Sequence, residues 1–142
     1  MSDEPAVRLR AGTPQDAERF ALVGQATFLE SYAAWLAEPA WRGWLVEAVE
    51  GEAPVGYLIA GPSDLPLADT DERDLEIKRI YLLHRFQRRG LARAMMDEAM
   101  AWARERGCRR LLLGVYSRNE SALAFYAHLG FDAHAFLRAL AA

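Results

Sequence analysis

The stretch "LEIKRIYLLHRFQRRGLARAM", residues 75–95, decides how this chain folds. Its first nine residues are rich in β-branched and aromatic side chains, which favour a β-strand. From residue 90 onward, Leu91, Met95, Ala99 and Trp102 recur at helical spacing and predict a helix over 90–106. Gly107 suits the residue just past the end of that helix. A strand therefore leads through a short arginine-rich turn into a long helix.

The residues that follow extend this pattern. "RRLLLGVY", residues 109–116, is a continuous apolar run of the kind found in strands buried on both faces. A strand, a helix and a second strand in this order predict two parallel neighbouring strands. Ser117 and Glu120 could form a capping box, and they predict a second helix over 120–129 that Gly130 ends.

The first half of the chain predicts a strand, a helix and a hairpin. "AVRLRAG", residues 6–12, alternates like a strand, and Thr13, Pro14 and Asp16 mark a helix start. The helix is expected to carry Phe20, Val23, Gln25, Phe28 and Tyr32. Residues 44–61 read as a hairpin that turns at 50–54, and "FDAHAFLRALAA", residues 131–142, is expected to end the chain as a strand. The fold class is mixed α/β in a single domain over 1–142, with a core at about 74–131.

Composition narrows the class of protein. The chain has 142 residues with 52% hydrophobic and 26% charged residues, as in ordinary globular domains. A net charge of -3 weighs against a dedicated nucleic-acid binder. The single cysteine, the lack of a membrane-length apolar run and the acidic N-terminus predict a cytoplasmic protein without a membrane partner. The three histidines have no ligand-like spacing, so we expect no metal site.

The turn before the long helix looks like an anion site. Gly90 and Ala92 are small, so backbone N–H groups there could approach a ligand closely. Arg88, Arg89 and Arg93 add positive charge at a helix N-terminus, which favours phosphate. The turn lacks both the GxxxxGK[ST] and the GxGxxG patterns. A solvated basic helix start is the alternative, and these residues alone do not decide between the two.

Two motifs in this order resemble a known family. Gln87-Arg88-Arg89-Gly90-Leu91-Ala92 resembles the CoA-binding signature Q/R-x-x-G-x-G/A of the GNAT (GCN5-related) N-acetyltransferases. Asn119, a helix bearing Tyr126, and Gly130-Phe131 resemble that family's second signature. The resemblance implies a single-domain GNAT-like fold with a mixed central sheet and a βαβα acetyl-CoA-binding core. It also implies direct acetyl transfer from acetyl-CoA to a primary amine, and it is strongest to the polyamine (spermidine/spermine) acetyltransferase-like members.

The resemblance assigns roles to particular residues. Backbone groups at Ile80–Leu82 would pair with the pantetheine arm, and the N–H of Leu82 would donate to the thioester oxygen. Asn119 would fix the cofactor near the second helix. The implied cofactor-binding residues are Ile80, Tyr81, Leu82, Gln87, Arg88, Arg89, Gly90, Leu91, Ala92, Arg93, Asn119, Ala122 and Phe125.

Direct transfer needs a base for the amine and an acid for the leaving thiolate. Glu76 is the candidate base, and alternation would place it on the strand face of Ile80 and Leu82; the alternative is a carboxylate paired with Lys78 or an arginine. Tyr126 matches the family's general acid, and the alternative is a core aromatic residue whose hydroxyl is satisfied elsewhere. Cys108 is expected to be a small buried filler, not a nucleophile. The Tyr81 side chain is expected to point into packing.

The acceptor is less defined than the donor. The acidic stretch 64–76 could attract a cationic small-molecule amine such as a polyamine, or it could be a solvated loop. The segment before the hairpin is shorter than this branch of the family leads us to expect, and about eleven residues follow Phe131. The acceptor pocket is then either reduced or completed by a partner subunit, as in a homodimer. Three alternatives stay open: a protein or peptide acceptor, a non-catalytic acyl-CoA-binding module, and an arginine-driven nucleic-acid binder.

Overall fold

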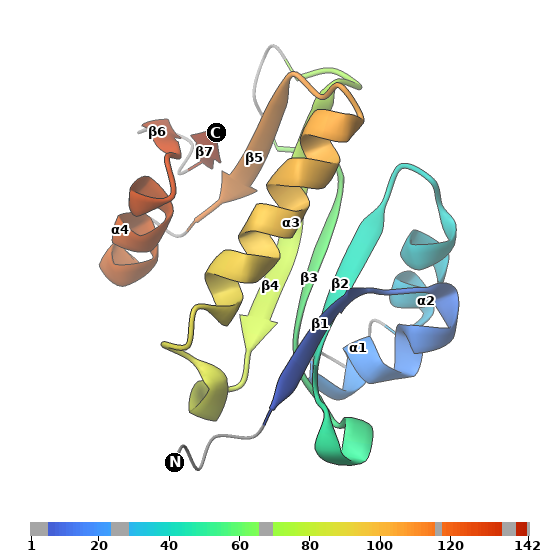
Figure 1. The fold of residues 1–142 in the computed structure, drawn as a ribbon. Helices are drawn as coiled ribbons and strands as arrows, with labels where there is room; N and C mark the ends of the chain where they lie inside the picture. The colour runs from blue at the N-terminus through green and yellow to red at the C-terminus, as the bar shows by residue number, and fades with distance from the viewer. Residues whose placement is uncertain (1–5, 24–28, 66–69, 116–117, 135–138, 142) are drawn as a thin grey trace. The chain divides into compact units, whose positions relative to one another are not determined.

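The computed structural model describes residues 6–23, 29–65, 70–115, 118–134 and 139–141 (Figure 1). They divide into two compact units. The first contains the chain up to Ile59 together with Arg79–Asp97, and the second contains Ala60–Lys78 and Glu98–Ala142. No helix in these ranges is long and apolar enough to cross a membrane.

The first unit begins with a strand, two helices and a hairpin. Up to Ile59 its elements are β1 (Val7–Ala11), the 3-10 turn η1 (Pro14–Asp16), α1 (Ala17–Val23), α2 (Leu29–Ala37), β2 (Arg42–Ala48), η3 (Glu50–Glu52) and the first part of β3 (Pro54–Pro62). β1 and β2 are antiparallel, with Val7 opposite Ala48 and Ala11 opposite Trp44. Strands lie in the order β1-β2-β3-β4. The structure thus confirms the predicted first strand and hairpin.

The helices α1 and α2 form a core with the strands of this unit. Phe20 and Tyr32 are fully buried and pack with Leu45, Tyr57 and Ile59. A Cβ atom at Gly43 would lie 2.8 Å from the Phe20 ring, so a glycine there lets β2 approach the helices. One predicted helix is in fact two, α1 and α2. Gln25 and Phe28, which were expected on it, lie outside the described residues.

The predicted helix start at Thr13–Asp16 is confirmed. The Thr13 N–H donates to Oδ2 of Asp16 at 2.8 Å, which closes the first turn. The Asp16 carboxylate also accepts hydrogen bonds from both terminal nitrogens of the Arg10 guanidinium, at 2.9 and 2.8 Å. These hydrogen bonds lower the pKa of Asp16 from 3.8 to about 2, against the opposing effect of burial.

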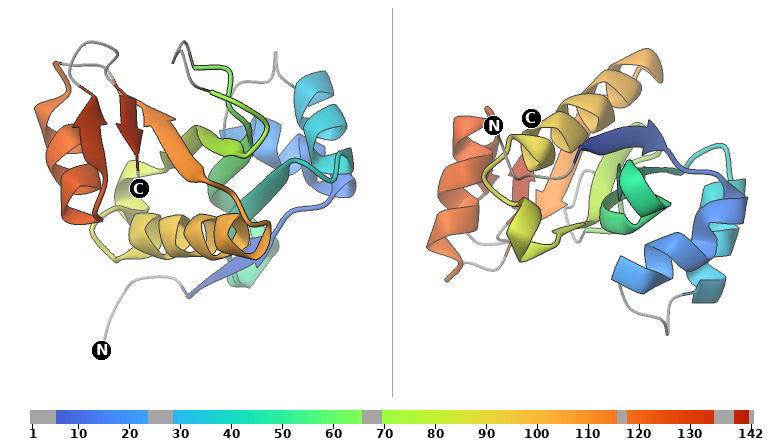
Figure 2. Two further views of the ribbon diagram at one scale, coloured as in Figure 1. Left: turned by 90° about the horizontal axis from the view of Figure 1, so that it is seen from above. Right: turned by 60° about the horizontal axis from the view of Figure 1, so that its bottom comes forward.

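The second unit contains the βαβα pattern. β4 (Asp74–Leu82) begins there, α3 (Leu91–Glu105) ends there, and β5 (Arg110–Gly114), α4 (Glu120–His128), β6 (Asp132–His134) and β7 (Ala139–Ala141) follow. β4 and β5 are parallel from Asp74 opposite Arg110 to Ile77 opposite Leu113, as predicted. The strands continue in the order β5-β7-β6, with α4 beside β6 (Figure 2). The single expected C-terminal strand is therefore a pair of short antiparallel strands.

Strand β4 contains one residue more than the strand opposite it. The Leu83 N–H donates to the Val55 carbonyl at 2.9 Å, and the Ser63 N–H donates to the Asp74 carbonyl at 3.1 Å. Between these bonds β4 contributes residues 75–82 and β3 contributes 56–62, so β4 has a β-bulge. A bulge breaks the period-two alternation along a strand. Regular alternation along β4 therefore does not by itself place Glu76 and Leu82 on one face, and their shared face stays a prediction.

Candidate functional site

The predicted anion site, residues 87–93, lies where β4 leads into α3. We call this turn the cradle. After Leu82 the chain forms the 3-10 turn η4 (His84–Phe86), whose Phe86 is buried. The Gln87 side chain donates to the Leu82 carbonyl at 3.0 Å. Gln87, expected to touch the cofactor, thus ties the turn to the end of the strand.

Two residues of the turn have left-handed backbone conformations. Arg88 has φ 63° and Gly90 has φ 77°. Such turns make concave arrangements of N–H groups that bind anions. A Cβ atom at Gly90 would meet nothing within 4 Å. The glycine is therefore favoured by the backbone angle at this position and not by a lack of space for a side chain. Left-handed Arg88 has no sequence signal, since an L-residue with a side chain adopts this region at a cost of about 1 kcal/mol.

The first turn of α3 supplies further donors. The first helical hydrogen bond runs from the Ala94 N–H to the Gly90 carbonyl at 2.9 Å. The N–H groups of Leu91, Ala92 and Arg93 precede it, so they have no acceptor within the helix. The positive end of the helix dipole lies at the same place. The predicted residues 87–93 are therefore together in one N–H-rich turn.

The three arginines of this turn differ in position. Arg89 places its guanidinium carbon 5.7 Å from the centre of the Phe86 ring. Arg88 and Arg93 are exposed. The exposed pair is better placed to reach an anion from solvent than Arg89 is.

The end of β4 offers a backbone edge. The β4–β5 register ends at Ile77 opposite Leu113, and β5 ends at Gly114, so the register assigns no β5 residue to positions 79–82. Because the Leu83 N–H points toward β3, the N–H and carbonyl of Leu82 point to the other edge. The Gln87 contact with the Leu82 carbonyl agrees with this direction.

The side chains at this edge differ from expectation in one case. Leu82 is buried, and a Cβ atom at Gly56 would lie 2.6 Å from its Cδ1 atom. Tyr81 is 46% exposed. The expectation that Tyr81 points into packing is wrong, because the described residues leave nearly half of its surface exposed.

Asn119 caps the second helix. Its Oδ1 atom accepts hydrogen bonds from the Ala122 N–H at 3.2 Å and from the Ser121 hydroxyl at 3.3 Å. The predicted helix over 120–129 is confirmed, but Asn119 is its N-cap. Ser117, the expected capping residue, lies outside the described residues.

Tyr126 is buried among aromatic rings. Its ring centre lies 5.2 Å from that of Phe125 and 6.0 Å from that of Phe131. Burial raises the pKa of its hydroxyl, so the neutral form persists to higher pH. Within the described part of the chain, no group forms a hydrogen bond with this hydroxyl. The described residues therefore do not supply the hydrogen-bond partner that the alternative, a purely structural Tyr126, would require.

Glu76 is buried and held through one oxygen. Its Oε1 atom accepts from the Ser63 hydroxyl at 3.3 Å, the Asp64 N–H at 3.1 Å and the Lys78 ammonium at 3.0 Å. The pairing with Lys78 that the sequence left open is thus present. Its other oxygen, Oε2, accepts no hydrogen bond from a residue in the described ranges.

Three acids of the acidic stretch are paired with cations. Asp64 accepts from Lys78 at 2.9 Å, and Asp71 pairs with Arg73 at 2.8 Å. Asp74 is fully buried and accepts from both Arg109 and Arg110. These pairs offset the negative field that would attract a polycation.

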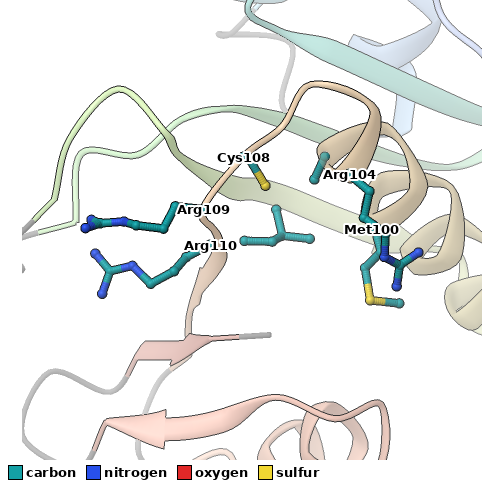
Figure 3. Close-up of a pocket in the computed structure, with 7 residues that line it drawn as sticks. Met100, Arg104, Cys108, Arg109 and Arg110 are labelled. Atoms are coloured by element: carbon teal, nitrogen blue, oxygen red, sulfur yellow. The ribbon is translucent and has the colours of Figure 1, made fainter.

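Figure 3 shows residues that line a hollow between the end of α3 and the start of β5. The volume of this hollow is about 180 Å³. Cys108 and Arg104 line it, and Met100 and Leu111 form part of its apolar wall. Burial raises the pKa of the Cys108 thiol, which disfavours the reactive thiolate. The raised thiol pKa agrees with the expectation that Cys108 is not a nucleophile, but Cys108 is only partly buried and lines the hollow, so it is not the buried filler that was expected. No group of three or more candidate metal ligands occurs within the described ranges.

A strand that ends in an N–H-rich turn at the start of a long helix is an arrangement of α/β proteins that can bind a phosphate group. The acetyltransferase (GNAT) family model matches residues 14–131. The chain belongs to this family.

Relatives and solved structures agree with this assignment. An uncharacterized N-acetyltransferase of Lactobacillus delbrueckii subsp. lactis, encoded in the pepI 3' region, is 40% identical over 92 residues, which are 63% of this chain and 53% of that protein. Escherichia coli YjgM, also described as an uncharacterized N-acetyltransferase, is 33% identical over 95 residues, which are 67% of this chain and 53% of that protein. This chain spans about half the length of these relatives.

Two solved structures share the fold. Arabidopsis thaliana NAA60 with a bisubstrate analogue has a TM-score of 0.73 at 17% identity, covering 96% of this chain and 98% of that one. The aminoglycoside N-acetyltransferase AAC(6')-Iy in complex with CoA has a TM-score of 0.72 at 17% identity, covering 88% and 91%. At such identities the likeness concerns the fold.

Proposed function

We propose that this chain is an acetyl-CoA-dependent N-acetyltransferase that moves an acetyl group directly to a primary amine. The observation that carries the proposal is the turn from Gln87 to Ala92. It combines two left-handed residues with the free N–H groups of the first turn of α3. Acetyl-CoA would supply the activated acetyl thioester. The family match over 14–131 supports treating residues 1–142 as one acetyltransferase domain.

The cradle fits a pyrophosphate. Backbone N–H groups from Arg88 to Arg93 surround the concave turn, and charge-assisted hydrogen bonds to phosphate are about twice as strong as neutral ones. Exposed Arg88 and Arg93 add forked donors for phosphate oxygens. Residues 87–93 therefore fix the diphosphate end of the cofactor.

The open edge of β4 fits the pantetheine arm. The backbone of Ile80–Leu82 would hydrogen-bond its amides as if to an added strand. The Leu82 N–H points to this edge, so it can donate to the thioester oxygen as that atom gains negative charge. Asn119 at the start of α4, with Ala122 and Phe125 on that helix, would contact the cofactor.

Glu76 and Tyr126 complete the chemistry. Oε1 of Glu76 is held by three donors, which leaves Oε2 to accept the amine proton, directly or through water. Tyr126 keeps its proton because burial raises its pKa, so its hydroxyl can protonate the leaving thiolate. Cys108 has no part in this route.

We propose a small primary amine as the acceptor. The solved aminoglycoside enzyme supports a small amine within this fold. The resemblance to polyamine acetyltransferases favours a polyamine, but the cations paired with Asp64, Asp71 and Asp74 weaken the electrostatic reason for preferring a polycation.

A thiol-release screen tests the proposal. The protein is incubated with acetyl-CoA and a panel of polyamines, aminoglycosides, amino acids and peptides, and free CoA thiol is measured. We expect release with at least one small amine. Acetyl-CoA binding by calorimetry without release from any amine would favour the non-catalytic acyl-CoA-binding module instead.

A further inference from the structure

Lys78 is the only lysine in the chain, whereas the other sixteen basic residues are arginines. It lies on β4 two positions after Glu76, and its side chain is only 13% exposed. A buried ammonium is costly unless it is paired and hydrogen-bonded. The contacts that satisfy Lys78 therefore indicate what this residue does.

Its contacts join two carboxylates. The Nζ atom lies 3.0 Å from Oε1 of Glu76 and 2.9 Å from Oδ1 of Asp64. The hydrogen bond and charge of Lys78 lower the pKa of Asp64, so Asp64 stays ionised and keeps its hold on the ammonium. Glu76 is buried, whereas Asp64 is exposed to solvent. Asp64 thus acts as an outer tether for a cation that faces the buried carboxylate.

Two more donors share the same oxygen of Glu76. The Ser63 hydroxyl and the Asp64 N–H both donate to Oε1, at 3.3 and 3.1 Å. Three donors on one oxygen fix the rotation of the carboxylate and direct its other oxygen away from them. An ammonium suits this place because it is a compact point charge, whereas a guanidinium needs room for a planar fork.

We infer that Lys78, tethered by Asp64, is a positioning residue for the transfer reaction: it holds Oε1 of Glu76 so that Oε2 receives the proton of the acceptor amine. The inference rests on the proposed function, and in particular on Glu76 as the base. Lys78 itself touches neither substrate in this scheme. Its effect on the rate must therefore pass entirely through Glu76.

A double-mutant cycle tests this dependence. Lys78→Met removes the ammonium and keeps much of the side-chain volume. With an acceptor found in the thiol-release screen, we expect Lys78→Met to lower kcat by on the order of 10- to 100-fold, while the Kd for acetyl-CoA stays unchanged. In a Glu76→Gln background, the same substitution should cause no further loss. Asp64→Asn should lower kcat less than Lys78→Met does.

The control removes a positive charge elsewhere. Arg104→Gln lies on the exposed side of α3 and should leave kcat unchanged. Thermal unfolding of every variant checks that lost turnover does not reflect lost folding. If Lys78→Met does not fold, Ser63→Ala and Asp64→Asn are carried through the same cycle with Glu76→Gln.

The outcomes separate the two proposals. Additive losses in kcat, or unchanged kcat in Lys78→Met, would overturn the positioning role while leaving the acetyltransferase proposal intact. Full activity of Glu76→Gln would overturn both Glu76 as base and the role of Lys78. A wild-type protein that releases no thiol with any amine would overturn the proposed function itself.

Discussion

Gly90 is the residue on which the cradle depends. Gly90→Glu places a carboxylate where a phosphate is proposed to bind, at a backbone angle that disfavours any side chain. We expect it to abolish acetyl-CoA binding in calorimetry. The strain costs about 1 kcal/mol of unfolding free energy.

Gly51 provides a matched control for Gly90. Its φ is 81°, and a Cβ atom there also meets nothing within 4 Å. Gly51→Glu should cost similar stability and leave acetyl-CoA affinity unchanged. Equal loss of affinity in the two variants would show that the effect at Gly90 is not local to the cradle.

Tyr126→Phe tests the proposed acid. No described group bonds its hydroxyl, so stability should change little, whereas kcat should fall on the order of 100-fold or more. Because burial raises the pKa of this hydroxyl, the wild type should keep its proton to higher pH than an exposed tyrosine does. Steady-state kinetics measure the loss, and the Kd for acetyl-CoA should not change.

Tyr57→Phe is the control for this substitution. The Tyr57 hydroxyl lies 3.3 Å from that of Tyr32 in the core of the first unit. Its loss should cost about 1 kcal/mol of stability with no effect on turnover. A drop in kcat of equal size in both variants would remove Tyr126 from the mechanism.

Single residues were predictable only where a residue type carries its own signal. Gly90, Asn119 and Tyr126 occupy specified positions of the two sequence motifs. The left-handed Arg88 and the exposed Tyr81 were not predictable, because backbone angle and coverage depend on neighbouring elements. The hydrogen bond from Ser63 to Glu76 could not be predicted from the sequence either, since thirteen positions separate the two residues.

At the scale of elements, the start of α1 depends on an ion pair. Asp16 has a pKa of about 2 in the folded chain against 3.8 in the unfolded one. A lowered pKa gives stability that is fully present above pH 4 and is lost as the pH falls from about 4 to about 2. The contribution is about 1–2 kcal/mol after allowance for solvent screening.

Asp16→Asn should therefore reduce the difference in the free energy of unfolding between neutral and acid pH. Urea unfolding at pH 6 should show the variant less stable than the wild type by this amount, and at pH 2 the two should converge. A difference that stayed constant between pH 6 and pH 2 would contradict the role of the Arg10 pair.

Elements with strong periodicity were predicted well. The helix α3 and the parallel pair β4–β5 follow from apolar spacing and from the strand–helix–strand order. The division into α1 and α2 was missed because Phe20 and Tyr32 fit one helical pattern. The bulge in β4 was missed because alternating and bulged strands can have the same composition, and only the opposing hydrogen bonds reveal the extra residue.

For the molecule as a whole, ligand binding should appear as stability. Acetyl-CoA at 100 times its Kd should stabilise the folded chain by about 2.7 kcal/mol, which raises the unfolding temperature by several degrees in a chain of this size. Differential scanning fluorimetry measures the shift. In Gly90→Glu the shift should vanish, and a shift of equal size there would contradict the cradle.

Charge at this scale argues against the nucleic-acid alternative. The net charge is -3, and Arg109 and Arg110, which made the sequence look basic, both bind the buried Asp74. Charge balance could be read from the sequence, but the partners of individual arginines could not, since Asp74 lies 35 positions before Arg109.

The buried Asp74 has a further consequence for the order in which the sheet opens. Its two arginines fasten the first residues of β4 and β5, where Asp74 lies opposite Arg110. A pair of strands fastened at one end frays from the other, so amide hydrogens should exchange with solvent more slowly near Leu111 than near Leu113. Residue-resolved deuterium exchange would show this gradient, and Asp74→Asn should flatten it.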